Sequence, residues 1–360
     1  MTALPRSAVA REAPDEPWPS NRAHRLRPAG IAEHFRLDSV GGALAPIGGD
    51  LHRSCRRPPI VIAVTEALTG FRSQTVAVGE ATIFARVGGS GPPLLLLHGF
   101  PQTHLCWTRV AAALAKKFTV VLADLTGYGK SRGPEPDADG ANYSKRAVAA
   151  QMVAVMEALG HKRFSVAGHD RGARVAYRLA LDHAARVERL AVLSILPTFA
   201  MWRRLEHIEN AIATYHWFLL AQNPPIPHDL LAGAPGKHLR NTIASWTKSG
   251  TLDAFTAEEL TAYEAAFSRP EVIAAVCAEY RAGWTTDRQH DADDLEAKRK
   301  IEAPVLVLWG QDEYPEAEML TAWRQLADKV IARPVDCGHF VVEEATEETL
   351  RALEDFFRAR

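Results

Sequence analysis

The stretch FSVAGHDRGAR, residues 164–174, decides how the chain folds. A β-prone apolar run ends at Gly168, and a helix-prone run over 173–181 begins almost at once. The residues between them, Gly168-His-Asp-Arg-Gly172, have the spacing of a nucleophile elbow, in which a strand turns sharply into a helix. Both glycines have a steric reason, because a Cβ two positions from the central residue would collide with the turn. We therefore expect a strand, a strained turn at Asp170 and a helix.

The central residue of this turn, Asp170, carries the chemistry. The strain projects its side chain above the sheet, at the N-terminus of the following helix, where anions are favoured. A carboxylate can attack an alkyl carbon, and water can then hydrolyse the ester that forms. The simpler interpretation is a glycine-rich turn with a capping aspartate. These five residues alone favour neither, so the rest of the chain has to decide.

Composition limits the class of protein. The chain has 360 residues, 47% hydrophobic and 24% charged, which is ordinary for a globular protein of one large domain or two modest ones. A formal net charge of -1 gives no electrostatic reason to expect a nucleic-acid or membrane partner. The four cysteines are scattered without metal-ligand spacing, and no signal segment or membrane span is visible. These features predict a cytoplasmic protein with free thiols and no metal.

The chain divides into four segments. Residues 1–69 are rich in alanine, proline and arginine without periodicity, which predicts a mostly disordered extension. Strand and helix patterns alternate over 70–197 and again over 300–360, which predicts one mostly parallel sheet flanked by helices on both faces. Between them, 198–299 has helical patterns with aromatic stripes and no clear strand. This block is expected to be an inserted helical cap.

Two further motifs belong with the elbow. Leu97-His-Gly-Phe100 follows a predicted buried strand, and the Phe100 N–H is expected to pair with the Arg171 N–H in an oxyanion hole. His339 follows the last predicted strand, at the sheet edge where open α/β sheets keep their ligand sites. It also comes last in the order nucleophile, acid, histidine that α/β-hydrolases follow.

Together these motifs give the chain a resemblance to a known family. From about Gly70 onward the sequence resembles an α/β-hydrolase-fold haloacetate dehalogenase, of the fluoroacetate dehalogenase family. The matching segments are His98-Gly-Phe-Pro-Gln-Thr-His104, Gly168-His-Asp-Arg-Gly-Ala-Arg174, His216-Trp217, Tyr280-Arg-Ala-Gly283 and Gly338-His-Phe340.

The resemblance implies a role for each matched residue. Asp170 would attack the halogen-bearing carbon of a small haloacid, and His339 would activate the water that hydrolyses the ester. Arg171 and Arg174 would bind the substrate carboxylate. Three cap side chains would donate hydrogen bonds to the departing halide and a fourth would line the pocket; these are His216, Trp217 and Tyr280, and Trp246. No cofactor is implied. The oligomeric state is left open, with a homodimer the commonest assembly of soluble proteins.

The sequence departs from the family at one position. Members carry the aspartate that orients the histidine after the sixth strand, where this chain has Ser194. Serine cannot stabilise an imidazolium as a carboxylate does. After the next strand come Asp312 and Glu313, in a loop where many α/β-hydrolases place their acid. The spacing from Gly310 favours Glu313 and leaves Asp312 second.

Two rival functions stay open. An epoxide hydrolase also uses an aspartate nucleophile but normally needs two cap tyrosines; Tyr280 could be one, with Tyr215 or Tyr263 as the second. The arginine pair weighs against it, because a neutral epoxide needs no carboxylate clamp. Alternatively, loss of the acid at Ser194 would leave a catalytically weak protein that binds small carboxylates.

Overall fold

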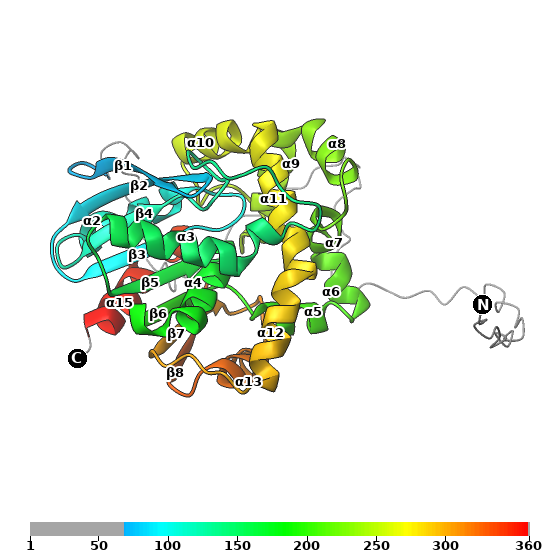
Figure 1. The fold of residues 1–360 in the computed structure, drawn as a ribbon. Helices are drawn as coiled ribbons and strands as arrows, with labels where there is room; N and C mark the ends of the chain where they lie inside the picture. Colours follow the sequence, from blue (N-terminus) through cyan, green and yellow to red (C-terminus); the bar gives the residue numbers. More distant parts are fainter. Residues whose placement is uncertain (1–67, 359–360) are drawn as a thin grey trace, which may run out of the picture. The chain divides into compact units, whose positions relative to one another are not determined.

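The fold is organised around one eight-stranded sheet, seen in a computed structural model that describes residues 68–358 (Figure 1). The strand order is β1-β2-β4-β3-β5-β6-β7-β8. The bounds are β1 (Arg72–Val78), β2 (Ala81–Gly89), β3 (Pro93–Leu97), β4 (Thr119–Ala123), β5 (Phe164–His169), β6 (Val187–Leu193), β7 (Val305–Gly310) and β8 (Val330–Val335). β1, β2 and β4 pair antiparallel, and every other pair is parallel. The predicted mostly parallel sheet is confirmed.

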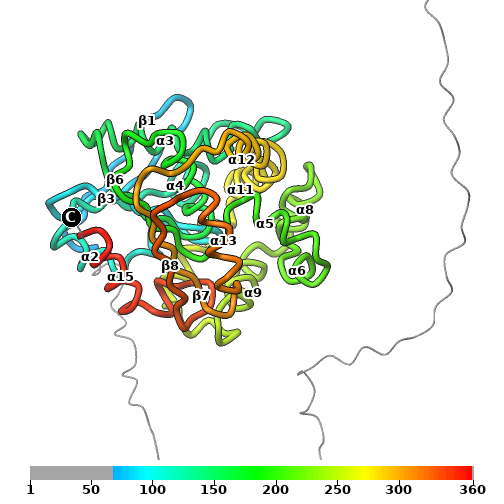
Figure 2. The backbone as a smooth tube through the Cα atoms, turned by 90° about the horizontal axis from the view of Figure 1, so that it is seen from below, coloured from blue at the N-terminus to red at the C-terminus, as the bar shows by residue number. Residues whose placement is uncertain are grey.

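Helices cover both faces of this sheet. The flanking helices are α2 (Thr108–Leu114), α3 (Lys145–Ala158), α4 (Arg171–Asp182), α13 (Glu316–Leu326), α14 (Val341–Glu344) and α15 (Thr346–Arg358), with short 3₁₀ turns η1 (His104–Trp107), η2 (Ala141–Tyr143) and η3 (Ala184–Arg186). In β3, Leu95 and Leu97 pack into the core under α3, α4 and α13, whereas Leu94 and Leu96 pack under α2 and α15. Figure 2 shows α2 and α15 side by side. Because successive side chains of a strand point to opposite faces, a continuous apolar run fills both cores.

Eight helices lie between β6 and β7, and we call residues 198–296 the helical insertion. They are α5 (Thr198–Arg204), α6 (Ile208–Ala213), α7 (His216–Leu220), α8 (Ile226–Ala232), α9 (Pro235–Trp246), α10 (Ala257–Phe267), α11 (Pro270–Trp284) and α12 (Thr286–Glu296). The longest, α11, contacts α7, α8, α10 and α12 (Figure 1). Its Pro270 stands at the first helical position, where the missing N–H costs nothing.

Several expectations from the sequence can be compared with the structure only over the residues that it describes. The extension predicted over 1–69 lies almost wholly outside the described residues. Of the four cysteines, the three within 68–358 are free and buried. Within this range, none of the helices has both the length and the apolar composition needed to cross a bilayer.

Candidate active site

The elbow places Asp170 between β5 and α4. Its φ of 46° lies in the left-handed region, which a residue with a side chain seldom occupies. A Cβ on Gly168 would meet the backbone of Gly172, and a Cβ on Gly172 would meet the carbonyl of His98. The collision with the turn that was inferred for both glycines is therefore confirmed for Gly168, whereas Gly172 leaves room for the backbone that follows β3. Surrounding contacts hold the strained turn, including a 3.1 Å hydrogen bond from the Asp170 N–H to the Leu193 carbonyl.

A backbone donor fixes one oxygen of the Asp170 carboxylate. The Phe100 N–H donates to Asp170 Oδ1 at 2.9 Å. The expected partner donor, the Arg171 N–H, makes no hydrogen bond within residues 68–358. Burial would raise the pKa of Asp170, but His339 and Arg171 lower it to about 2. The side chain is therefore an ionised carboxylate with Oδ1 held and Oδ2 left free to react.

Loops after β7 and β8 bring a histidine and a carboxylate to the same place. His339 Nε2 lies 3.9 Å from Asp170 Oδ2, and His339 Nδ1 lies 2.7 Å from Glu313 Oε1. A carboxylate only accepts hydrogen bonds, so Nδ1 carries a proton. Nε2 faces Asp170 and has no hydrogen-bond partner in the described chain. Burial lowers the pKa of His339, but Glu313 more than offsets it, so the net shift is upward. The arrangement has the geometry expected of a nucleophile, a base and an orienting acid.

The two carboxylates after Gly310 lie in different environments. Glu313 is partly buried and faces His339. Asp312 has a side chain that is 71% exposed and forms a 3.4 Å ion pair with Lys248. The structure therefore separates Asp312 from the histidine. Ser194, where the family's aspartate would stand, is buried with φ 56°, and its hydroxyl has no partner in the described chain.

Each of the two arginines uses some of its guanidinium donors in hydrogen bonds and keeps another unpaired among the described residues. Arg171 donates from Nε to Glu279 Oε1 at 3.1 Å and from Nη2 to the Glu279 carbonyl at 3.3 Å. Arg174 donates from Nη1 to the Leu196 carbonyl and to Thr198 Oγ1, both at 3.1 Å. Among the described residues, Arg171 Nη1 and Arg174 Nε are buried without a partner. Unpaired buried donors of this kind are costly, which indicates that a ligand completes them.

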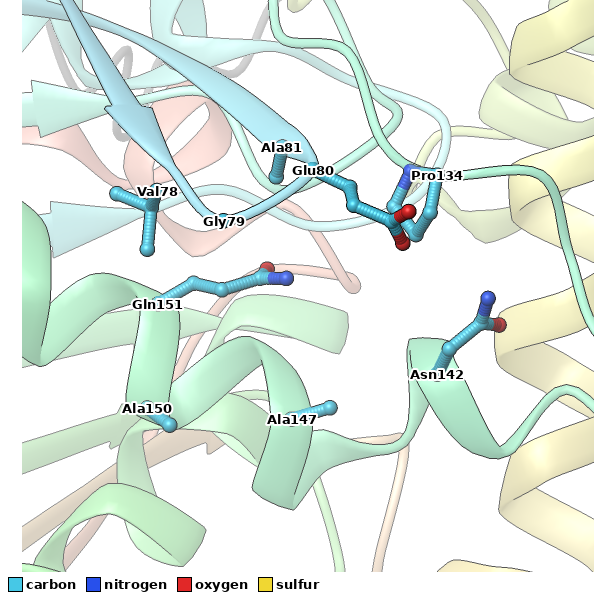
Figure 3. A pocket seen from close by; sticks show the side chains of 9 residues that line it. All are labelled: Val78, Gly79, Glu80, Ala81, Pro134, Asn142, Ala147, Ala150 and Gln151. Carbon is cyan, nitrogen blue, oxygen red and sulfur yellow. The ribbon is translucent and has the colours of Figure 1, made fainter.

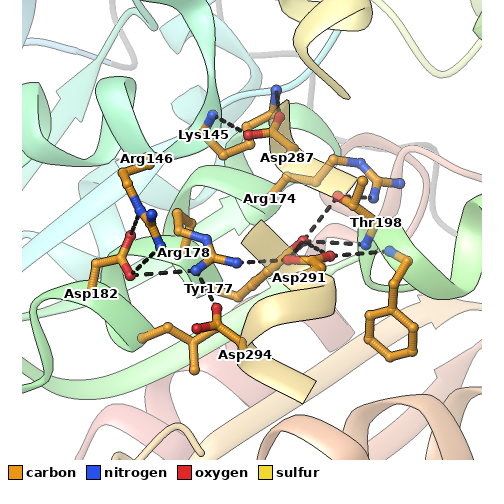
Figure 4. A network of polar contacts seen from close by, with 12 residues as sticks. Lys145, Arg146, Arg174, Tyr177, Arg178, Asp182, Thr198, Asp287, Asp291 and Asp294 are labelled. Carbon is orange, nitrogen blue, oxygen red and sulfur yellow. Dashed lines mark hydrogen bonds and ion pairs between the residues drawn. The ribbon is translucent and has the colours of Figure 1, made fainter. Parts of the chain in front are cut away.

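The network around Arg174 continues into the helical insertion (Figure 4). Tyr177 Oη lies 2.9 Å from Thr198 Oγ1 and 3.0 Å from Asp291 Oδ2. Arg178 in turn pairs with Asp291 at 2.7 Å and also with Asp294. Burial raises the pKa of Asp291 to about 6, although Arg178 opposes that shift. Through this chain α4 is tied to α5 and α12, next to one of the two free arginine donors.

Aromatic side chains of the helical insertion enclose the arginines and Asp170. The guanidinium carbon of Arg171 lies 3.9 Å from the centre of the Tyr280 ring. The guanidinium carbon of Arg174 lies 4.6 Å from the centre of the Trp217 ring. The His216 ring is 4.7 Å from Trp246 and 5.9 Å from Tyr280. The Trp246 ring is in turn 5.2 Å from that of His339. The structure therefore brings together all four aromatic residues that the resemblance singled out.

The protonation of these rings suits hydrogen-bond donation. Burial lowers the pKa of His216 to about 3, so the imidazole is neutral and keeps one N–H. Burial raises the pKa of Tyr280, so its phenol stays protonated. The other two tyrosines considered for an epoxide site have different surroundings. Tyr215 is 54% exposed, and Tyr263 is buried with Glu343 and Cys106 among its ionisable neighbours.

Two surface pockets flank the core without containing Asp170. One, of about 350 Å³, lies between the β1–β2 turn and α3 (Figure 3). None of its lining residues is a predicted site residue. The other, of about 250 Å³, is lined by Trp246, Lys248, Asp312, Glu313 and neighbouring backbone. It therefore reaches the outer side of the His339–Glu313 pair.

Sequence reasoning missed two residues that contact the arginines, Glu279 and Thr198. Glu279 had a signal, because it is a single acid within an otherwise apolar stretch, 272–280, and such a charge is rarely buried without a partner. Thr198 had none, since a threonine at the start of a helix is ordinary.

Comparison with known proteins shows which family and which solved structures this chain is similar to. The family described as "alpha/beta hydrolase fold" matches residues 92–346. A fluoroacetate dehalogenase from Burkholderia sp. is 40% identical over 80% of this chain and 94% of its own length. A soluble epoxide hydrolase from Corynebacterium sp. is 32% identical over 75% of this chain and 91% of its own length. A solved structure from Nostoc sp. PCC 7120, classed with the alpha/beta hydrolases, has a TM-score of 0.78 and 45% identity, covering 81% of this chain and 100% of that one.

Proposed function

This chain belongs to the alpha/beta hydrolase fold family, and we propose that it hydrolyses the carbon–halogen bond of short 2-haloacids. The simplest reaction is haloacetate and water to glycolate and halide. One observation carries the proposal: a carboxylate nucleophile, Asp170, stands beside two arginines that each keep an unpaired buried donor. A negatively charged substrate with an electrophilic alkyl carbon matches both features.

In the first step Asp170 Oδ2 attacks the carbon that bears the halogen. The carbon–halogen bond breaks, the halide leaves with the bonding electrons, and an ester to Asp170 remains. Arg171 and Arg174 hold the substrate carboxylate, which aligns the carbon with the nucleophile. His216, Trp217 and Tyr280 donate hydrogen bonds to the leaving halide in the enclosed site, where few waters can solvate it.

In the second step water attacks the carbonyl carbon of the ester. His339 Nε2 takes a proton from that water, and the Phe100 and Arg171 N–H groups stabilise the oxyanion on Oδ1. The bond between the Asp170 carbonyl carbon and the substrate oxygen then breaks, and the His339 imidazolium returns the proton to the leaving glycolate. Glu313 stabilises the imidazolium throughout, which is the role that the family gives to the aspartate at the position of Ser194. In this scheme the helical insertion works as a cap.

The epoxide hydrolase relative supports a second candidate with the same nucleophile. A neutral epoxide would need a pair of acids for its oxygen and no arginine clamp. Tyr280 is in place, but Tyr215 is 54% exposed, and the ionisable neighbours of Tyr263 include Glu343 and Cys106 rather than Asp170. A carboxylate-binding protein without turnover is disfavoured by the Glu313–His339 contact, because that contact supplies the acid that Ser194 does not.

Halide release from fluoroacetate and chloroacetate tests the proposal, with Asp170→Asn as the control and intact-mass spectrometry alongside. We expect continuous release by the parent and none by the variant, since an amide is not a nucleophile for alkyl carbon. Turnover of a simple epoxide without halide release from any haloacetate would favour the rival. Saturable glycolate binding with no turnover of either substrate would favour the binding protein.

A further inference from the structure

A buried cluster of charges lies behind Arg171, on the side away from its free donor. Its centre is Glu279 of α11, whose carboxylate contacts the Lys145 Nζ at 2.9 Å and the Tyr128 hydroxyl at 2.5 Å. Asp287 of α12 lies 3.5 Å from the same Lys145 Nζ and accepts the Lys145 N–H at 2.8 Å. Lys145, Glu279 and Asp287 are each at most 4% exposed. The proposed reaction uses none of these groups directly.

The hydrogen bonds on Arg171 come from one residue and occupy one edge of its guanidinium. Glu279 takes the Nε hydrogen with its side chain and an Nη2 hydrogen with its backbone carbonyl. The ring of the next residue, Tyr280, lies 3.9 Å from the guanidinium carbon. A planar fork held at Nε and Nη2 and packed against a ring has little freedom to rotate. What remains without a partner in the described chain is Nη1, which is buried.

We propose that Glu279 is the positioning residue that fixes Arg171 so that Nη1 is presented to the carboxylate of the substrate; this inference rests on the proposed function. α11 supplies Glu279 and Tyr280 as neighbours in sequence, so the same helix turn orients the carboxylate-binding arginine and provides a donor for the halide. Docking of this helix therefore sets the distance between the two ends of a small haloacid.

The negative charge of Glu279 matters as well as its shape. Burial alone would raise the pKa of Glu279, but Arg171 and Lys145 outweigh it and lower that pKa, so the group is ionised. It thus faces two cations, and charge-assisted hydrogen bonds of this kind are roughly twice as strong as neutral ones. An amide at this position keeps an acceptor for Nε but no longer holds the guanidinium against competing orientations.

The test is Glu279→Gln in the full chain, with KM and kcat for chloroacetate and the Kd for glycolate measured by calorimetry. We expect KM and Kd to rise roughly tenfold, the loss of one charge-assisted contact, while kcat changes far less. The matched control is Glu259→Gln, another buried carboxylate that pairs with an arginine, Arg109 of α2, but contacts neither Arg171 nor Arg174. It should lower the melting temperature and leave KM and Kd unchanged.

A second variant separates positioning from simple charge balance. Lys145→Met with Glu279→Gln removes one buried cation and one buried anion and leaves the charges of Arg171 and Asp287 in balance, so it should fold even if the single variant does not. We expect the rise in KM and Kd to persist, because Arg171 still lacks its partner. Parental KM and Kd in either variant, or an equal rise in Glu259→Gln, would overturn the inference. If the parent releases no halide, the proposed function fails, and the glycolate Kd alone decides whether Glu279 positions the carboxylate site.

Discussion

Replacing Glu313 by glutamine should separate the two halves of the reaction. The substitution keeps an oxygen that can accept the His339 Nδ1 hydrogen, but it removes the charge that stabilises the imidazolium. The carboxylate and the ring nitrogen are 2.7 Å apart and both side chains are mostly buried. Alkylation of Asp170 needs no base, so it should proceed. Hydrolysis of the ester needs His339 as a base, so it should slow.

The size of the effect follows from the loss of that charge. Two unit charges about 4 Å apart, with an effective dielectric constant near 20, attract by about 4 kcal/mol. Loss of the acid in a comparable triad costs on the order of 10⁴ in rate, which is about 5.4 kcal/mol. We therefore expect steady-state halide release to fall by a factor between about 10³ and 10⁴.

Rapid-quench measurement of halide follows the alkylation of Asp170, and intact-mass spectrometry follows the ester that remains. Glu313→Gln should release one equivalent of halide quickly and then hold a stable carboxymethyl ester on Asp170. The matched control is Asp312→Asn, one residue away but exposed and paired with Lys248, which should turn over like the parent. Parental turnover by Glu313→Gln without an adduct would refute the assignment of the acid. So would a defect in Asp312→Asn as large as that of its neighbour.

Three other perturbations have expected outcomes. Tyr280→Phe should slow defluorination more than debromination, since fluoride depends most on a hydrogen-bond donor; equal slowing in a halide-release series would contradict this. Glu313 raises the pKa of His339, so ester hydrolysis should increase as pH rises through a value above 6.5, and the single-turnover pH profile of Glu313→Gln should lie lower. Burial and the neighbouring Glu259 raise the pKa of Glu343 to about 8, above its value in the unfolded chain. The contribution of Glu343 to the free energy of unfolding therefore falls as pH rises from about 4.5 to 8. Glu343→Gln should therefore raise the melting temperature at pH 8 and change it little at pH 5; an equal change at both would count against the shift.

The mostly parallel sheet and the position of the sharp turn at Asp170 could be predicted from the sequence. A continuous apolar run such as 94–97 is typical of a strand that is buried on both faces. Glycine at 168 and 172 indicates a sharp turn between a strand and a helix. The strained aspartate, the loop histidine and the block of helices after β6 follow from such local patterns. These features depend on residues that lie close together along the chain, where sterics and periodicity act directly.

The identity of the acid and the environment of the arginines depend on the tertiary structure. Asp312 and Glu313 are adjacent in sequence, and only the way the loops after β7 and β8 meet decides that Glu313 faces His339. Likewise, Glu279 reaches Arg171 across 108 residues because α11 passes the first residue of α4. Pairing of charges at such separations depends on how helices and loops pack over the sheet. The sequence by itself determines the scaffold and the candidate nucleophile, and the packing of distant segments determines which charges surround that candidate.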